Sequence, residues 1–203
     1  MSTRLSNHYA NLLAKFGDTH ESAQWSSRDS QELRFKILSQ IGDLNNSSVL
    51  DFGCGTGHLS SWFLQNGFNV RYTGVDVLEE FFEVGKSKAI PRSRFGYLNQ
   101  FEGEKFDYIF ISGVFNNKRK NNRQFYQDTI LNLFPRCNKG IAFNMMSTYV
   151  DYKNPQLFYE SPVRVFNFLK NHITPFVNLR NDYRLKQGVI PFEFCVYAYQ
   201  SLE

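Results

Sequence analysis

Two short stretches hold the residues best suited to binding a cofactor: a glycine-rich segment and a carboxylate further along the chain. The first, residues 51–58, reads Asp-Phe-Gly-Cys-Gly-Thr-Gly-His and begins at the end of a short apolar run. Its glycines, Gly53, Gly55 and Gly57, permit backbone conformations that a Cβ would forbid, and they let a ligand lie close to the main chain. The N–H groups at the start of the helix that should follow make this loop rich in hydrogen-bond donors.

The carboxylate is Asp76, which ends a second apolar run, residues 70–75. A glycine loop after one strand and an acid after the next is the layout that holds an adenosine, with the acid on the ribose hydroxyls. Capping of the following helix is the structural alternative for Asp76. The NAD fingerprint requires a glycine at the sixth position counted from Gly53, and that position is His58. The spacing therefore favours S-adenosylmethionine over NAD.

In these residues the chain resembles class I S-adenosylmethionine-dependent methyltransferases. Residues 51–57 are similar to the first motif of that family, and residues 74–77 (Gly-Val-Asp-Val) are similar to the second. The resemblance implies S-adenosyl-L-methionine as cofactor and S-adenosyl-L-homocysteine as product. It also implies that Gly53, Cys54, Gly55 and Gly57 face the methionine part, with Asp76 on the ribose and Val77 on the adenine.

The elements that must position these residues follow from the apolar periodicity. Helices are expected over residues 4–16, over a stretch ending near 41 and capped by Ser27 or Asp29, and at 58–65, 78–86, 121–134 and 161–171. Strands are expected at 48–52, 70–75, 94–98, 106–112, 140–145, 176–183 and 192–199, the last two paired as a hairpin. This alternation predicts an α/β fold with a mostly parallel sheet and an antiparallel edge.

The family resemblance covers roughly residues 45–200 and makes the predicted fold more specific. It implies a Rossmann-like, seven-stranded sheet with helices on both faces and an antiparallel last strand. We expect one domain over 1–203, in which residues 1–44 form a helical lid over the cofactor mouth and 45–203 the α/β core.

Ligands of open α/β sheets lie beyond the carboxyl ends of the strands, so residues that follow strands are further candidates. Asn99 and Gln100 stand where the family often has an acid on the adenine amino group, and a plain loop asparagine is the alternative. Ser112 and Asn116 should border cofactor and acceptor. The segment 112–116, Ser-Gly-Val-Phe-Asn, departs from the Asn/Asp-Pro-Pro-Tyr motif of enzymes that methylate exocyclic base amines or glutamine amides, which argues against those targets.

The N-terminal segment carries the candidate acceptor contacts Tyr9, Trp25 and Arg34, with Gln31 nearby. Trp25 is an aromatic wall for a cation–π contact or a plug that ties the linker to the core. For Arg34 the two expected roles are binding a carboxylate of the cofactor or acceptor and forming a surface ion pair. Residues 25–38 and the segment 143–149, which ends at Tyr149, resemble small bacterial methyltransferases of polysaccharide and other small-molecule biosynthesis.

No catalytic residue can be assigned from the sequence. An oxygen nucleophile benefits from a general base, and His20, His58 and Asp151 are the candidates. Each also has an ordinary interpretation: a solvated loop residue for His20, a helix start for His58 and a surface carboxylate for Asp151. No Cys/His cluster has the spacing of metal ligands, so no metal is expected.

The charge and composition of the chain limit the classes of partner that it is expected to bind. The net charge of +4 is mild, and its one concentrated source is Lys118–Lys120 with Arg123; this run is a solvated face or a holder of a phosphate or carboxylate of the acceptor. Nucleic acid is therefore an unfavoured partner. No apolar run is long enough to span a membrane, and residues 1–16 do not resemble a secretion signal. The three cysteines suit reduced, packed thiols in a cytoplasmic protein.

The favoured function is methyl transfer from S-adenosylmethionine to a hydroxyl or amine of a small polar acceptor, such as a sugar or sugar nucleotide. An RNA or protein methyltransferase is one alternative, and a catalytically silent protein that binds S-adenosylmethionine is another. The sequence gives neither the acceptor nor the oligomeric state.

Overall fold

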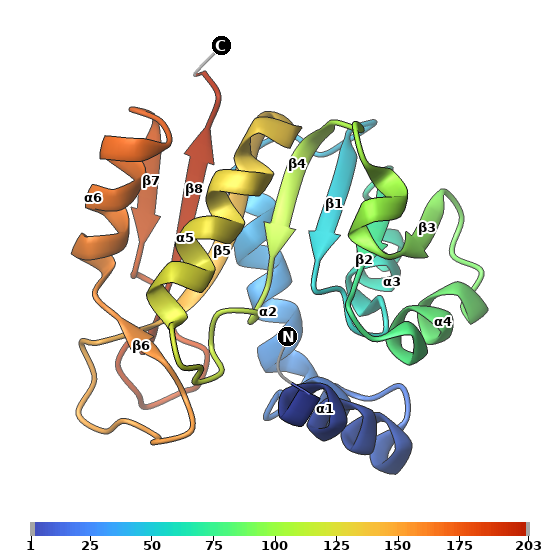
Figure 1. The fold of residues 1–203 in the computed structure, drawn as a ribbon, viewed down its shortest axis with the longest axis horizontal. Helices are drawn as coiled ribbons and strands as arrows, with labels where there is room; N and C mark the ends of the chain where they lie inside the picture. Colours follow the sequence, from blue (N-terminus) through green and yellow to red (C-terminus); the bar gives the residue numbers. More distant parts are fainter. Residues whose placement is uncertain (1–2, 202–203) are drawn as a thin grey trace.

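A twisted sheet forms the centre of the molecule in the computed structural model, which describes residues 3–201, with side chains from residue 6 (Figure 1). The strand order is β3-β2-β1-β4-β5-β8-β7, and the short β6 pairs with β5 outside this path. The strands are β1 (Ser48–Phe52), β2 (Arg71–Val75), β3 (Ser93–Gly96), β4 (Phe106–Ile111), β5 (Cys137–Ser147), β6 (Tyr159–Glu160), β7 (Val177–Arg180) and β8 (Glu193–Tyr199).

The predicted α/β class and mostly parallel sheet are confirmed. Strands β1 to β6 pair in parallel, whereas β8 runs antiparallel to both of its neighbours, β5 and β7. The expected hairpin of β7 and β8 forms, with Val177 opposite Ala198 and Arg180 opposite Cys195. The two-residue strand β6 is an addition to the seven predicted strands, and β5 begins three residues before its predicted start at Gly140.

Helices cover both faces of the sheet, as predicted. The helices are α1 (Thr3–Phe16), α2 (Arg28–Leu38), α3 (His58–Gln65), α4 (Glu79–Ser87), α5 (Asn122–Leu133) and α6 (Pro162–His172), with 3₁₀ turns at His20–Ala23, Ser39–Ile41, Leu98–Phe101 and Phe134–Arg136. Side chains of α5 and α6 fill one buried cluster with one face of the sheet, and those of α2, α3 and α4 fill the other. Figure 1 shows α5 in front of the sheet and α2 behind it.

Local sequence explains several helix boundaries. Ser27 is the N-cap of α2, and its hydroxyl accepts from the Ser30 N–H at 3.1 Å, which satisfies one of the first free N–H groups. The N-cap Ser161 and Pro162, whose fixed φ suits a first helical position, begin α6. The third predicted strand stops at Gly96 because the chain turns at Leu98 into a 3₁₀ helix.

The strand order places β1 between β2 and β4, and the chain crosses from one side of β1 to the other at this point. Ligands of open α/β sheets bind where the order reverses, beyond the carboxyl ends of the strands. Figure 1 shows α1 lying beyond these ends of β1 and β4. Within residues 3–201, no helix is both long and apolar enough to cross a membrane.

Candidate functional site

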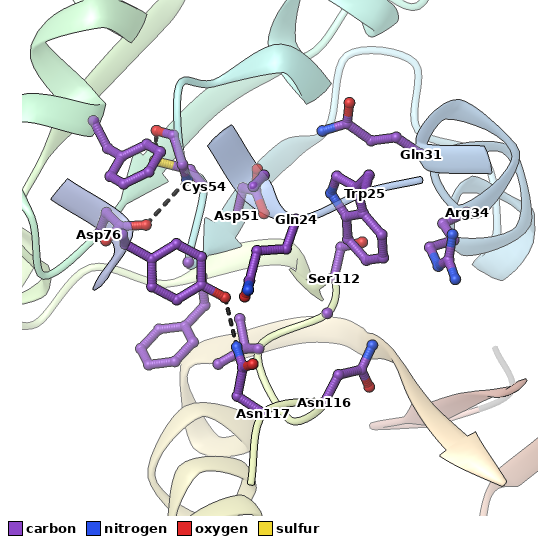
Figure 2. A pocket seen from close by; sticks show the side chains of 18 of the residues that line it. Gln24, Trp25, Gln31, Arg34, Asp51, Cys54, Asp76, Ser112, Asn116 and Asn117 are labelled. Carbon is purple, nitrogen blue, oxygen red and sulfur yellow. Dashed lines mark hydrogen bonds between the residues drawn. The ribbon is translucent and has the colours of Figure 1, made fainter. Parts of the chain in front are cut away.

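A cavity of about 730 Å³ opens at the carboxyl ends of β1, β2 and β4 (Figure 2). It holds most of the residues that the sequence singled out. Its lining includes the expected cofactor residues Gly53, Cys54, Gly55, Asp76, Val77, Asn99 and Ser112, and the expected acceptor residues Tyr9, Trp25, Arg34 and Asn116. The volume lies in the range of small-molecule and cofactor sites.

The glycine loop is fixed against the end of β2. The N–H groups of Gly53 and Cys54 both donate to the Val75 carbonyl, at 2.8 and 3.0 Å. Gly57 is the N-cap of α3 with φ +70°, and a Cβ at this position would lie 2.4 Å from the Phe95 ring. Only glycine fits there without displacing that ring. Gly57 does not line the cavity, so its place in the motif shapes the loop.

Asp76 directly follows the carboxyl end of β2, and backbone N–H groups hold its carboxylate in place. Its Oδ2 accepts from the Gly55 N–H at 3.0 Å, and its Oδ1 accepts from the N–H groups of Val77 and Leu78 at 2.7 and 3.1 Å. Burial raises the pKa of Asp76, against the opposing effect of these backbone donors. A carboxylate has about four lone-pair sites, so the group keeps capacity for a ligand donor. The Asp76 carboxylate also accepts from the N–H groups just before α4, so it partly fulfils the alternative role of a helix cap.

Asp51 is a second, more deeply buried carboxyl group in the cavity wall. It lies in β1 and is 3% exposed, and one of its oxygens accepts from the Tyr72 hydroxyl at 2.6 Å. Burial raises its pKa to about 7, although the Tyr72 hydrogen bond works in the opposite direction. Burial therefore favours the neutral form of this carboxyl group in the free protein. A cationic group arriving in the cavity would favour the carboxylate form.

Arg34 lies in the cavity wall, but a buried ion pair engages its guanidinium. Its Nε donates to Glu193 Oε2 at 2.9 Å, and both side chains are at most 5% exposed. A second guanidinium nitrogen donates to the carbonyl and hydroxyl of Ser30. Asn144 Nδ2 donates to the other oxygen of Glu193 at 2.8 Å. The ion pair of Arg34 is thus a buried one, and the network engages its Nε and one of its two terminal nitrogens.

Trp25 packs against neighbouring side chains and also lines the cavity. Its ring stacks on the Arg34 guanidinium at 4.3 Å, and it lines the cavity (Figure 2). On the loop after β4, Gly113 has φ +74°, and a Cβ there would lie 2.6 Å from the Trp25 ring. The Gly113 N–H donates to Asn144 Oδ1, which joins this loop to the Arg34 network. Trp25 is therefore a cavity wall that also anchors the linker.

Four polar atoms in the cavity lining are buried without a hydrogen-bond partner in the part of the chain that the structure describes. They are Gln31 Oε1, Ser112 Oγ, Asn116 Oδ1 and Arg119 Nε. Gln31 and Asn116 are 7% and 9% exposed. Leaving a buried polar group unpaired costs about 1–3 kcal/mol. Four such atoms lie in the wall of one cavity, where a polar ligand or ordered water would pair with them.

Tyr9 ties α1 over the cavity. Asn117 Nδ2 donates to the Tyr9 hydroxyl at 2.5 Å, and the Tyr9 ring meets Phe81 of α4 edge-on at 6.1 Å. Behind α1, Lys88 Nζ pairs with Asp18 at 2.9 Å. Burial raises the pKa of Tyr9, so the hydroxyl is neutral at physiological pH. These contacts hold the first helix over the carboxyl ends of the strands.

Besides Gly57, two further expected ligand residues, Tyr149 and Gln100, lie outside the cavity lining. Tyr149 follows β5 and is 59% exposed. Gln100 turns back on its own 3₁₀ turn, where its Oε1 accepts from the Tyr97 N–H at 2.8 Å. A Cβ added at Gly96 would lie 2.1 Å from that oxygen, so the Gln100 side chain occupies the space beside Gly96. These local contacts explain why the Gln100 side chain does not reach the cavity.

The three candidate bases also lie away from the cavity lining. His58 Nε2 pairs with Glu32 at 2.8 Å between α3 and α2, and burial lowers its pKa. His20 lies 3.7 Å from Glu21, and Asp151 is exposed. No three His, Cys, Asp or Glu side chains in the described part of the chain come together as a metal site would require.

The basic run separates into residues with different environments. Arg119 lines the cavity, whereas Lys118 and Lys120 are exposed and lie outside the lining. Arg123 Nε pairs with the buried Glu160 at 2.7 Å. Only one cation of the run therefore faces the cavity.

Sequence reasoning passed over several lining residues. Asp51 belongs to the first motif, and its position directly before the glycine loop is the sequence signal for its place in the cavity wall. Phe192 and Lys186 come from the connection between β7 and β8. No pattern in that connection indicates its approach to β4, because the approach depends on how β8 inserts beside β5.

Comparisons with known proteins agree with this geometry. Residues 50–135 match the family described as "Methyltransferase domain". A provisionally named methyltransferase of Mycobacterium tuberculosis is 27% identical over 150 residues, which cover 70% of this chain and 90% of that protein.

Solved structures show the same fold at low identity. The plantazolicin methyltransferase BamL, in complex with a triazolic desmethylPZN analog and S-adenosylhomocysteine, has a TM-score of 0.64 at 14% identity, covering 96% of both chains. The Burkholderia thailandensis 1,6-didemethyltoxoflavin-N1-methyltransferase, with 1,6-didemethyltoxoflavin and S-adenosylhomocysteine, has a TM-score of 0.62 at 17% identity, covering 96% of this chain and 89% of that one. Both neighbours thus hold the product form of the expected cofactor beside the same arrangement of strands.

Proposed function

We propose that this chain, a class I methyltransferase by its domain and its fold, transfers the methyl group of S-adenosylmethionine to a hydroxyl or amine of a small polar acceptor, such as a sugar or sugar nucleotide. The observation that carries the acceptor class is the set of buried, unpartnered polar atoms on Gln31, Ser112 and Asn116. An apolar acceptor would leave all three unpaired, at about 1–3 kcal/mol each.

The residues of the cavity fit the cofactor. The Gly53–Gly55 backbone offers close approach, and Asp76 offers a carboxylate that the Gly55 N–H holds in place, so that hydroxyls of a ribose can donate to it. Asp51, buried beside the glycine loop, offers an acceptor for an ammonium group. Val77 and Asn99 line the remaining wall, where an adenine would lie.

The cofactor's sulfonium supplies an already activated methyl group. The protein's part is to align the acceptor, exclude water and, for a hydroxyl nucleophile, receive its proton. Trp25, held by Arg34 and Gly113, gives the acceptor a rigid wall. Gln31 and Asn116 provide amide groups that orient polar substituents against that wall.

The closed position of α1 supports a small acceptor over an RNA or protein. Tyr9 is joined to Asn117 across the cavity and packs on Phe81, so a polymer would have to displace the helix. The basic run adds little to an electrostatic footprint, because Arg123 is paired with Glu160. A nucleic-acid site typically gathers many unpaired cations on one face.

The test is methyl transfer from S-adenosylmethionine with a trideuterated methyl group. A cell extract is separated by ultrafiltration into small molecules and polymers, and both fractions are incubated with the protein. We expect the deuterated methyl group in the small-molecule fraction, on hydroxylated or aminated compounds, with formation of S-adenosylhomocysteine. Label confined to the polymer fraction would overturn the acceptor class, and binding without label in either fraction would support the catalytically silent alternative.

A further inference from the structure

We infer that the acceptor carries an anionic group, a phosphate or a carboxylate, which binds to Arg119 in the cavity wall. This inference rests on the proposed function and adds the charge of the acceptor to it. It also separates Arg119 from the other cations of residues 118–123.

Arg119 is a charged side chain that forms no ion pair with any residue the structure describes. Its guanidinium lies 4.1 Å from the centre of the Phe125 ring, so one face of the group is covered by an aromatic side chain. Its Nε is buried and has no hydrogen-bond partner among the described residues. Burial lowers the pKa of Arg119, and Tyr9 is the neighbouring group that opposes this effect. Arg119 is half-buried, and a partly desolvated cation is stabilised by an anion beside it.

The acids of the cavity are already engaged elsewhere. Asp76 accepts from three backbone N–H groups, and Asp51 accepts from the Tyr72 hydroxyl. Glu193, the buried acid behind the wall, is paired with Arg34. No carboxylate in the described part of the chain forms an ion pair with Arg119, which leaves its guanidinium available for the anion of a ligand.

The guanidinium suits a phosphate or a carboxylate, because its planar set of N–H donors matches two oxygens of either group. Elsewhere in the cavity, Gln31 and Asn116 present unpartnered amide oxygens, which require hydrogen-bond donors. The polar groups of the cavity wall therefore match a ligand that carries an acid at one end and hydroxyl or amine groups along the rest.

The experiment uses simple anions as probes. The full-length protein, saturated with S-adenosylhomocysteine, is titrated with inorganic phosphate and, separately, with acetate, and the Arg Nε–H signals are followed by NMR. We expect one Arg signal to shift on titration, and that signal should be missing in Arg119→Gln. We expect Arg119→Gln to weaken binding of the preferred anion by about 10- to 100-fold, the range for hydrogen bonds to charged groups, and Arg119→Lys to restore part of it.

Lys120→Gln is the matched control, since it removes an equal charge from an exposed position of the same run. Equal weakening by Lys120→Gln and Arg119→Gln would overturn the inference, because the anion would then respond to net charge alone. Weaker S-adenosylhomocysteine binding by Arg119→Gln, with anion binding unchanged, would also overturn it by assigning Arg119 to the cofactor's own carboxylate. If the wild type binds no S-adenosylhomocysteine, the proposed function fails, while the same titrations without cofactor still test Arg119.

Discussion

Replacing Asp51 by asparagine should stabilise the free protein at alkaline pH while weakening its binding of a cationic cofactor. The asparagine keeps the shape of the side chain and an oxygen that can accept from the Tyr72 hydroxyl, but it cannot ionise. The folded wild type must carry a buried carboxylate at high pH, and the variant does not. We therefore expect the ionised Asp51 to lower the free energy of unfolding of the free protein and to strengthen its binding of a cationic cofactor.

The magnitude follows from the pKa of Asp51, which burial raises from its ordinary value of 3.8 to about 7. Each pKa unit corresponds to about 1.4 kcal/mol, so full ionisation costs the folded state about 4 kcal/mol. Because the folded-state pKa is the higher one, stability is greatest below the unfolded pKa and falls as the pH rises through 7. Between about pH 5 and pH 8.5, the wild type should lose about 2–3 kcal/mol from this residue.

The assay is urea denaturation of wild type and Asp51→Asn at both pH values without ligand. The free energy of unfolding of the variant, minus that of the wild type, should increase by about 2–3 kcal/mol at the higher pH. Other titrating groups occur in both proteins and largely cancel in this difference. A difference that does not change with pH would refute the reasoning, because Asp51 would then have an ordinary pKa in the folded protein.

Three further predictions concern the cavity wall. Glu193→Gln should destabilise the protein by about 3–5 kcal/mol in urea denaturation, because it leaves buried Arg34 unpaired; a smaller loss in the double variant with Arg34→Met is expected, and an equal loss would contradict the pairing. Gly113→Ala should cost about 1–3 kcal/mol and alter tryptophan fluorescence, because its φ is strained for alanine and its Cβ meets Trp25; unchanged fluorescence would argue against this contact. Tyr9→Phe removes one hydrogen bond, worth about 1 kcal/mol, and should speed release of S-adenosylhomocysteine in stopped-flow measurements; an unchanged rate would mean that α1 does not retain the ligand.

Local patterns were enough to predict the sheet and the glycine loop. The central strands β1, β4 and β8 are largely apolar runs, and Asp76 directly follows β2, so the carboxyl ends of β1 and β2 could be placed at one edge of the sheet. The left-handed conformations at Gly53, Gly55 and Gly57 are as expected for a tight loop of this kind. These features depend on neighbouring residues in the chain, which is why they can be read from the sequence.

Contacts between distant residues could not be predicted in this way. Arg34 and Glu193 are 159 positions apart, and their pairing depends on the register of β8 beside β5. The basic run likewise gave no sign that Arg119 alone faces the cavity. Tyr149 also follows a strand, but its side chain is exposed and does not line the cavity.

Calorimetric titration with S-adenosylhomocysteine tests the central claim, that the cavity beside the glycine loop binds this cofactor. We predict saturable binding by the wild type and affinity about 10- to 100-fold lower in Asp76→Asn, whose amide has one acceptor oxygen instead of two. Asp128→Asn, on an outer face of α5, is the matched control and should bind as the wild type does. Absence of binding by the wild type, or equal affinity in Asp76→Asn, would contradict the account.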